Sequence, residues 1–234
     1  MNNTYPYFEE KTAPTGSTLY YSILFSSPEI RAAMTALHAF YQELDRICSG
    51  DPHIAHQRLA WWHDEIIRLA ENTPRHPITQ TLQSQIQKFS IPIETLHNLI
   101  DHPDFAHLTK LTALYIPGGN VEKLAPYANE LSQAFQLVDN IIHVRKILSP
   151  GEKSPTIGEF IQQTEQAKKH YQSAMDILPA ELRKTQLHQI IFAELQFKLL
   201  TEIQKSGFNV LTHKTSLTPL HKLWTAWKIK RSER

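Results

Sequence analysis

The amino-acid sequence predicts an all-α fold, and three observations lead to this prediction. Apolar residues recur at spacings of three and four along most of the 234 residues, as on the buried face of a helix. The strict alternation of a half-buried strand is almost absent, and prolines with short polar stretches separate the helical segments. Because the length suits one domain and no linker interrupts the chain, we predict a single-domain helical bundle over residues 1–234.

The first two helices are expected within residues 17–26 and 26–48. In the second, Ser27 can cap the helix, Pro28 fits the first turn and Glu29 favours the N-terminus. The same spacing predicts further helices over 54–72, 76–91, 93–102, 105–119, 120–148, 156–178 and 180–207, the last of them stopped by Gly207. We expect an N-terminal arm over 1–16 and a basic amphipathic helix or tail over 216–234.

Composition limits the classes of function. A formal net charge of +1 gives no general attraction to nucleic acid, so we expect no nucleic-acid partner. The single cysteine, Cys48, excludes an intrachain disulfide framework and a cysteine-rich zinc site, and fits a reducing compartment. The N-terminus lacks the pattern of a signal peptide, and no segment approaches the roughly 18 to 20 apolar residues that span a bilayer. We therefore expect a cytoplasmic protein, either free or peripheral at the inner face of a membrane.

Four polar residues form a stripe on the predicted helix 120–148, and they are Gln136, Asp139, Asn140 and His143. The stripe fits a hydrogen-bonded core or a solvated helix face, because buried polar groups need partners. It also fits a site that faces Asp45. Asp139 and His143 are four residues apart, close enough on one face to share a metal ion, but two ligands without a third indicate a metal site only weakly.

Asp45 and Arg46 end the predicted helix 26–48. Asp45 shares a stripe with His38, Tyr41 and Gln42, next to the apolar face. This stripe can aim a carboxylate into a pocket. In the other interpretation Arg46 pairs with a surface acid, while a tyrosine or arginine elsewhere holds Asp45.

The C-terminal segment 216–234 mixes tryptophans with lysines and arginines. Trp224 and Trp227 alternate with cations in a pattern that suits a membrane surface or an acidic partner. The same pattern fits a helix that docks on the protein and keeps a solvated basic end. Trp61 and Trp62 are interpreted as core anchors.

Four stretches, taken in order, resemble the squalene and phytoene synthases. Residues 17–47 are similar to the first conserved region of that family, in which a tyrosine-bearing helix precedes a helix that ends in a DDxxD motif. Residues 59–82 resemble the following segment, residues 127–144 the second conserved region and residues 199–227 the C-terminal end. The resemblance implies an isoprenoid synthase fold. It also implies a shortened middle segment, because about twenty or more residues of the family are missing between "NLIDHPDF" and "LTALYIPGG".

The departures from the family fall on its magnesium-binding aspartates. DDxxD aligns with residues 45–49, where Asp45 is the only acid, and the second motif places His143 and Ile147 at aspartate positions. Magnesium prefers hard oxygen ligands, and a cation in place of a ligand about 4 Å away costs several kcal/mol even at an effective dielectric near 20. The resemblance therefore implies remnant catalytic positions at Asp45 and His143, and we expect neither a metal site nor a cofactor.

The first functional hypothesis is a pseudoenzyme that has lost Mg-dependent head-to-head prenyl transfer. It would act as a binding or assembly factor for an isoprenoid, a quinone or a membrane complex. The alternative is an active prenyltransferase that uses prenyl diphosphates, with one Mg ion held by Asp45, Asp139 and His143. A third hypothesis is a subunit that supports a paralogous synthase. The expected ligand-binding residues are Tyr20, Tyr41, Arg31, Arg46, Gln136, Asp139 and Asn140.

Overall fold

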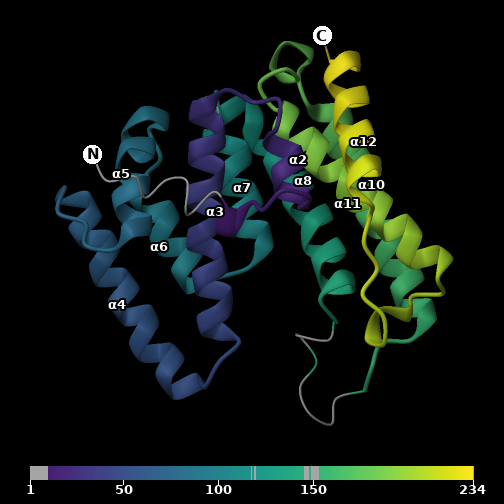
Figure 1. The fold of residues 1–234 in the computed structure, drawn as a ribbon, viewed down its shortest axis with the longest axis horizontal. Helices are drawn as coiled ribbons and strands as arrows, with labels where there is room; N and C mark the ends of the chain where they lie inside the picture. Colours follow the sequence, from purple (N-terminus) through teal and green to yellow (C-terminus); the bar gives the residue numbers. More distant parts are fainter. Residues whose placement is uncertain (1–9, 117, 119, 145–147, 149–152, 234) are drawn as a thin grey trace. The chain divides into compact units, whose positions relative to one another are not determined.

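The computed structural model describes residues 10–116, 118, 120–144, 148 and 153–233. These residues form helices, turns and loops, and none of them lies in a strand (Figure 1), so the all-α prediction is confirmed. The chain divides into two compact units. Unit 1 comprises Met1–Thr15 and Ser26–Val121, and unit 2 comprises Gly16–Phe25 and Glu122–Arg234. That residues 1–234 form one domain stays a prediction.

Unit 1 is built around helix α3. Its described helices are α3 (Pro28–Cys48), α4 (Pro52–Ala70), α5 (Pro77–Phe89), α6 (Ile93–Asp101) and α7 (Phe105–Tyr115). Helix α3 contacts α4, α5 and α7, while α4 also contacts α5 and α6. The predicted start of α3 is confirmed, because Ser27 Oγ accepts a hydrogen bond from Ile30 N, Pro28 lies in the first turn and Glu29 follows it.

Unit 2 is built around helix α11. Its described helices are α2 (Thr18–Ile23), α8 (Val121–Ile142), α10 (Ile157–Ile177), α11 (Leu187–Lys205) and α12 (Pro219–Ser232), with short 3-10 helices η1 (Ala180–Leu182) and η2 (Asn209–Leu211). Helix α11 contacts α2, α10 and α12, and α12 also contacts α2. The N-terminal α2 therefore belongs to the same unit as the C-terminal helix.

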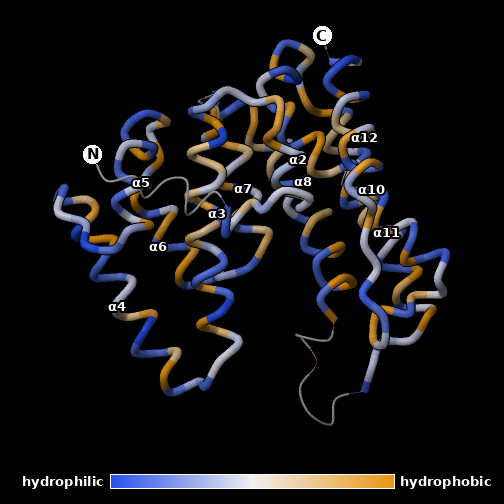
Figure 2. The backbone as a smooth tube through the Cα atoms, in the orientation of Figure 1, coloured by the Kyte–Doolittle hydropathy of each residue, from blue (hydrophilic) through white to orange (hydrophobic). Residues whose placement is uncertain are grey.

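Figure 2 shows apolar residues among polar ones along the helices, and the apolar side chains pack together. In unit 2, two apolar clusters result. One joins α8, α10, α11 and the segment after α11, with Val138, Phe160, Leu200 and Phe208 among its members. The other joins α2, α11 and α12, with Tyr21, Ile191, Leu195, Leu217 and Ala226 buried in it. Among the helices that the structure describes, none combines the length and apolar character needed to cross a bilayer.

Several helix predictions were wrong in extent, most of all those over 120–148 and 180–207. Helix α8 ends at Ile142, Val144 is helical again, residues 145–147 lie outside the described part, and Leu148 is not helical. The predicted helix 180–207 is broken into η1 and α11, because residues 183–186 form turns in which Thr185 Oγ1 donates to the Leu182 carbonyl at 2.6 Å. The stop at Gly207 is confirmed, since this glycine has a φ of +70° just after α11.

The turn between η1 and α11 fixes the end of α12. Arg183 Nε donates to Glu233 Oε2 at 2.9 Å, and a second guanidinium nitrogen, Nη2, donates to Oε1 at 2.7 Å. This bidentate pair is partly buried, and the hydrogen bonds to Glu233 are the largest cause that raises the pKa of Arg183.

Loss of the Arg183–Glu233 pair is expected to loosen the end of α12. Arg183→Ala should lower the free energy of unfolding by about 1–3 kcal/mol, because it leaves a partly buried carboxylate without its charged donor. Chemical denaturation measures this change. The control is Lys168→Ala, which removes an exposed pair with Glu165 and should cost less than about 1 kcal/mol. Equal losses in the two variants would show that the pair does not fix α12.

Candidate functional site

Unit 2 contains a groove of about 590 Å³. This volume lies within the roughly 300–1,000 Å³ of pockets that take small organic ligands. Helix α8 contributes its end, α11 its second half, and the segment between η2 and α12 forms one wall. The lining residues are Thr18, Ile142, His143, Gln196, Leu199, Ile203, Val210, His213, Lys214, Thr215, Ser216, Leu217 and Lys222.

The apolar part of the groove comes from the core of unit 2. Leu199 and Ile203 are four residues apart on α11, so both side chains lie on one side of that helix. Ile203 and Val210 are members of the cluster shared with α8 and α10, and Ile142 packs against it. The groove therefore has an apolar lining that the fold builds for its own packing.

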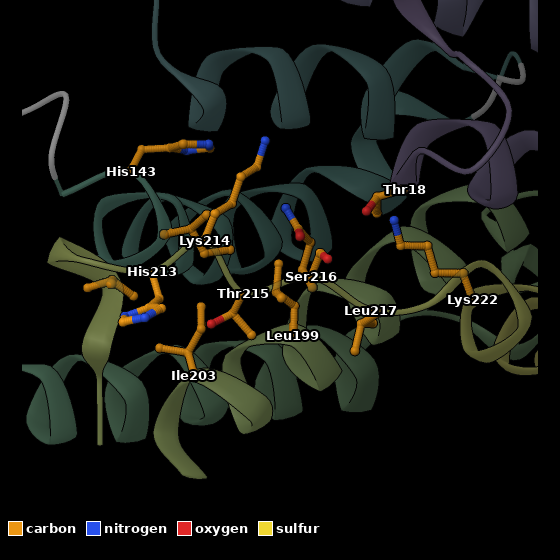
Figure 3. Close-up of a pocket in the computed structure, with 13 residues that line it drawn as sticks. Thr18, His143, Leu199, Ile203, His213, Lys214, Thr215, Ser216, Leu217 and Lys222 are labelled. Carbon is orange, nitrogen blue, oxygen red and sulfur yellow. The ribbon is translucent and has the colours of Figure 1, made fainter. Parts of the chain in front are cut away.

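The polar part of the groove is basic. Lys214 is exposed, and Lys222 is half-buried at the first turn of α12, where its Nζ donates to the Gly16 carbonyl at 2.8 Å. Burial lowers the pKa of Lys222. His143 and His213 add two imidazoles, and none of the described lining residues is Asp or Glu. Figure 3 shows His143, Lys214 and Lys222 as sticks that line the groove, with Leu199 and Ile203 below them in this view. Such a lining suits an amphiphile with an anionic head.

His143 is the only predicted site residue that the structure places in this groove. It follows the last residue of α8, but its backbone N still donates to the Asp139 carbonyl at 2.8 Å. Its ring Nδ1 lies 2.7 Å from Asp139 Oδ1, and this carboxylate fixes the orientation of the imidazole. Ile147, the other position of the second motif, lies outside the described residues.

The rest of the predicted polar stripe is paired along α8. Gln136 Nε2 donates to Asn140 Oδ1 at 2.9 Å, and both side chains are half-buried. The four polar residues therefore form two local pairs, each spanning four residues, as the hydrogen-bonded interpretation of the stripe expects. Their assignment as ligand-binding residues stays a prediction.

The remnant of the first motif lies at the end of α3, in unit 1. Arg46 is exposed and forms an ion pair with Glu43, as the surface interpretation predicts. Asp45 is half-buried, and its backbone carbonyl accepts a hydrogen bond from Ser49 Oγ at 2.7 Å. Ser49 thus closes the helix end at a position where the family has an acid. Because Asp45 belongs to unit 1 and His143 to unit 2, a shared ion between them stays a prediction.

The other predicted ligand-binding residues lie among aromatic neighbours or at a helix start. Tyr20 is half-buried on α2, edge-on to Tyr21 with ring centroids 5.1 Å apart. Tyr41 is half-buried on α3, edge-on to Phe105 at 5.7 Å. Arg31 is half-buried in the first turn of α3. The structure does not place these three in the groove, and their predicted role is not tested by it.

Sequence reasoning missed the wall of the groove. His213, Lys214, Thr215 and Lys222 lie in the stretch "THKTSLTPLHK". The sequence predicted a basic tail only from residue 216 and a resemblance to the family's C-terminal end over 199–227, and neither prediction assigned these residues to a groove. A signal was present, because a polar and basic run directly follows a glycine-stopped helix and precedes a capped one, which is typical of a functional loop. The run can be assigned to a groove only when α8 and α11 are placed beside it.

The donors near the two family motifs do not match the oxygen ligands that magnesium prefers. At the first motif Asp45 is the only acid, and at the second an imidazole is bound to Asp139. In the part of the chain that the structure describes, no group of three or more His, Cys, Asp or Glu side chains is placed to hold a metal ion.

Comparison with protein families gives one match. Residues 12–102 of the 234 match the family model described as squalene/phytoene synthase. A search of curated proteins gives no match. The matched stretch contains α2, α3 and the helix with the tryptophan pair, and it ends at His102, where the predicted shortening begins. The predicted resemblance to the squalene/phytoene synthase family is therefore confirmed over residues 12–102.

Proposed function

We propose that this squalene/phytoene synthase-like chain is a binding or assembly factor that holds an isoprenoid amphiphile with an anionic head group, such as a prenyl diphosphate. In this proposal the chain no longer performs Mg-dependent head-to-head prenyl transfer. The observation that carries the proposal is the groove of unit 2, in which a basic rim borders an apolar lining. A phosphate group would meet Lys214 and Lys222, while an apolar chain would lie against Leu199 and Ile203.

The geometry of the motif remnants supports a non-catalytic role. In prenyl transfer by the family, several carboxylates hold magnesium against the diphosphate. Here Arg46 pairs with Glu43, Ser49 closes a helix end and His143 is bound to Asp139. Since about 1.4 kcal/mol corresponds to a tenfold change in rate, losing carboxylates worth several kcal/mol should reduce metal-assisted ionisation below detection.

Binding is tested with a farnesyl diphosphate analogue whose bridging oxygen is replaced by sulfur, so that it does not ionise. Calorimetry should give saturable binding that magnesium does not strengthen. The double variant Lys214→Met/Lys222→Met keeps the side-chain length and removes both charges, and should weaken binding at least about tenfold. The matched control is Lys205→Met, an exposed lysine of the last turn of α11 that is not among the groove's lining residues.

Activity is tested in parallel with radiolabelled farnesyl and geranylgeranyl diphosphates and magnesium, and no prenyl product should form. Saturable binding that is equally strong in the double variant would exclude the groove as the site. Appreciable turnover would overturn the proposed loss of prenyl transfer.

Active prenyl transfer remains the second candidate because of the contact between Asp139 and His143. A carboxylate oxygen and an imidazole nitrogen 2.7 Å apart can supply two ligands to an ion. This candidate predicts binding of prenyl diphosphates that requires magnesium and is lost in Asp45→Ala and Asp139→Ala. Co-purification from the native cell tests the third idea, a subunit that supports a paralogous synthase.

A further inference from the structure

Helix α12 exposes a continuous apolar stripe. Leu220 is 79% exposed, Trp224 61%, Trp227 41% and Leu223 39%. These residues are spaced three, one and three apart, so they form one stripe along the helix. Single exposed apolar residues are ordinary on a protein surface, but a stripe with two tryptophans on one short helix indicates an interaction surface.

The stripe is not needed to hold α12 in unit 2. The opposite side of the helix does this, with Thr225 and Ala226 buried and Ile229 packed against the cluster that α12 shares with α2 and α11. The Arg183–Glu233 pair fixes the end of the helix. The buried side of α12 therefore holds the helix in unit 2, and the exposed apolar stripe is accessible to a partner.

The two aromatic rings of the stripe stack on each other. Trp224 and Trp227 stack with ring centroids 5.1 Å apart and an angle of 27° between the planes. The Arg231 guanidinium lies over the Trp227 ring, 5.5 Å from its centroid, so a cation contacts the aromatic pair directly. The exposed stripe therefore combines a stacked tryptophan pair with positive charge.

Charge decides which partner fits. The C-terminal half of α12 carries Lys228, Lys230 and Arg231, and Lys230 also lies 4.4 Å from the centre of the Phe25 ring. The helix sequence contains no Asp or Glu, and the carboxylate that follows it, Glu233, is neutralised by Arg183. The partner should therefore be apolar in its interior and negatively charged at its surface.

We propose that α12 is a docking helix for the surface of an anionic lipid bilayer. Tryptophan is favoured at the boundary between lipid head groups and acyl chains, and long cationic side chains can reach phosphate groups while their stems stay in apolar surroundings. Leu220, Trp224 and Trp227 would enter this boundary, and Lys228 and Arg231 would contact the head groups. This inference does not depend on the ligand of the groove.

The test measures sedimentation of the full chain with lipid vesicles. The wild type should bind vesicles of phosphatidylcholine and phosphatidylglycerol at least about tenfold more strongly than vesicles of phosphatidylcholine alone, and high salt should release it. Trp224→Ser/Trp227→Ser should lower the partition coefficient at least about tenfold. The matched control is Ile157→Ser/Ile161→Ser, which removes two exposed apolar side chains from α10 and should bind as the wild type does.

A second measurement keeps the test independent of folding in the serine variant. Bromine-labelled acyl chains should quench the tryptophan fluorescence of the wild type, and Trp224→Phe/Trp227→Phe, which should bind normally, should lose most of this quenching. Equal binding to charged and neutral vesicles would overturn the proposal. Vesicle binding of Trp224→Ser/Trp227→Ser that equals wild-type binding would also overturn it, as would quenching of Trp224→Phe/Trp227→Phe that equals wild-type quenching. Binding of the chain to an acidic protein without any binding to vesicles would overturn it as well.

Discussion

Replacing Glu65 with alanine is expected to lower the free energy of unfolding by about 3–5 kcal/mol, because a fully buried carboxylate binds four donors there. Oε1 accepts from Arg75 N and His76 N, each at 2.7 Å, and from Thr79 Oγ1 at 2.6 Å. Oε2 accepts from Arg68 Nε at 2.8 Å. Alanine would leave all four donors without this acceptor, at the junction that joins α4 to α5.

The protonation of Glu65 follows from the same contacts. Burial alone raises the pKa of this carboxyl, but the hydrogen bonds from His76, Thr79, Arg68 and Arg75 outweigh it and lower the pKa to about 2. Between pH 4.5 and about 2 the carboxylate therefore stays ionised in the folded protein, whereas an unfolded chain protonates it. Its contribution to stability is present above pH 4.5 and is lost as the pH falls toward 2.

Urea denaturation at neutral pH measures the effect of Glu65→Ala. Glu165→Ala is the control, because Glu165 is an exposed glutamate paired with Lys168 and its loss should cost less than about 1 kcal/mol. Overlapping unfolding curves for Glu65→Ala and the wild type would contradict a structural role for this network.

Acidification from pH 7 to pH 4 is expected to destabilise the wild type by about 3 kcal/mol through His38 alone. Burial lowers the pKa of this imidazole from 6.5 to about 4, and each pKa unit corresponds to about 1.4 kcal/mol. Below pH 6.5 the unfolded chain binds a proton that the folded chain does not, so stability falls with pH until the folded pKa is reached.

The variant His38→Gln should remove this part of the pH dependence. Urea denaturation at several pH values between 7.5 and 4 should give a steeper loss of stability for the wild type than for the variant. His53→Gln, at an exposed histidine in the first turn of α4, should lose stability as steeply as the wild type. Parallel curves for the wild type and His38→Gln would show that another group causes the acid sensitivity.

The helices could be predicted because local patterns determine them. The cap at Ser27, the stop at Gly207 and the apolar periodicity of α3 are visible within a few residues of sequence. The break at residues 183–186 interrupts a segment with helical spacing, and its turns include the hydrogen bond from Thr185 to the Leu182 carbonyl. The pairing of Arg183 with Glu233, which lies fifty residues later in the chain, could not be predicted in this way either. Helical spacing on its own cannot reveal such a partner.

The site was less predictable than the fold. The family motifs predicted a site at Asp45, Arg46 and the polar stripe of α8. Among these residues, only His143 of the stripe lines the groove. The basic residues Lys214 and Lys222 carry no motif, and they line the groove only because α11 and α12 fold together. Spacing describes residues on one helix, whereas a groove depends on distances between helices.

During synthesis, helix α2 is made long before the helices that cover it. It emerges early from the ribosome, yet Tyr21 is buried against Ile191, Leu195 and Ala226 from α11 and α12 near the other end of the chain. At roughly 5–20 residues per second the nascent chain spends on the order of ten seconds or more before those partners exist. A chain that ends before α11 would leave the apolar side of α2 without either of these partner helices, so chaperones and proteases could recognise incomplete products by it.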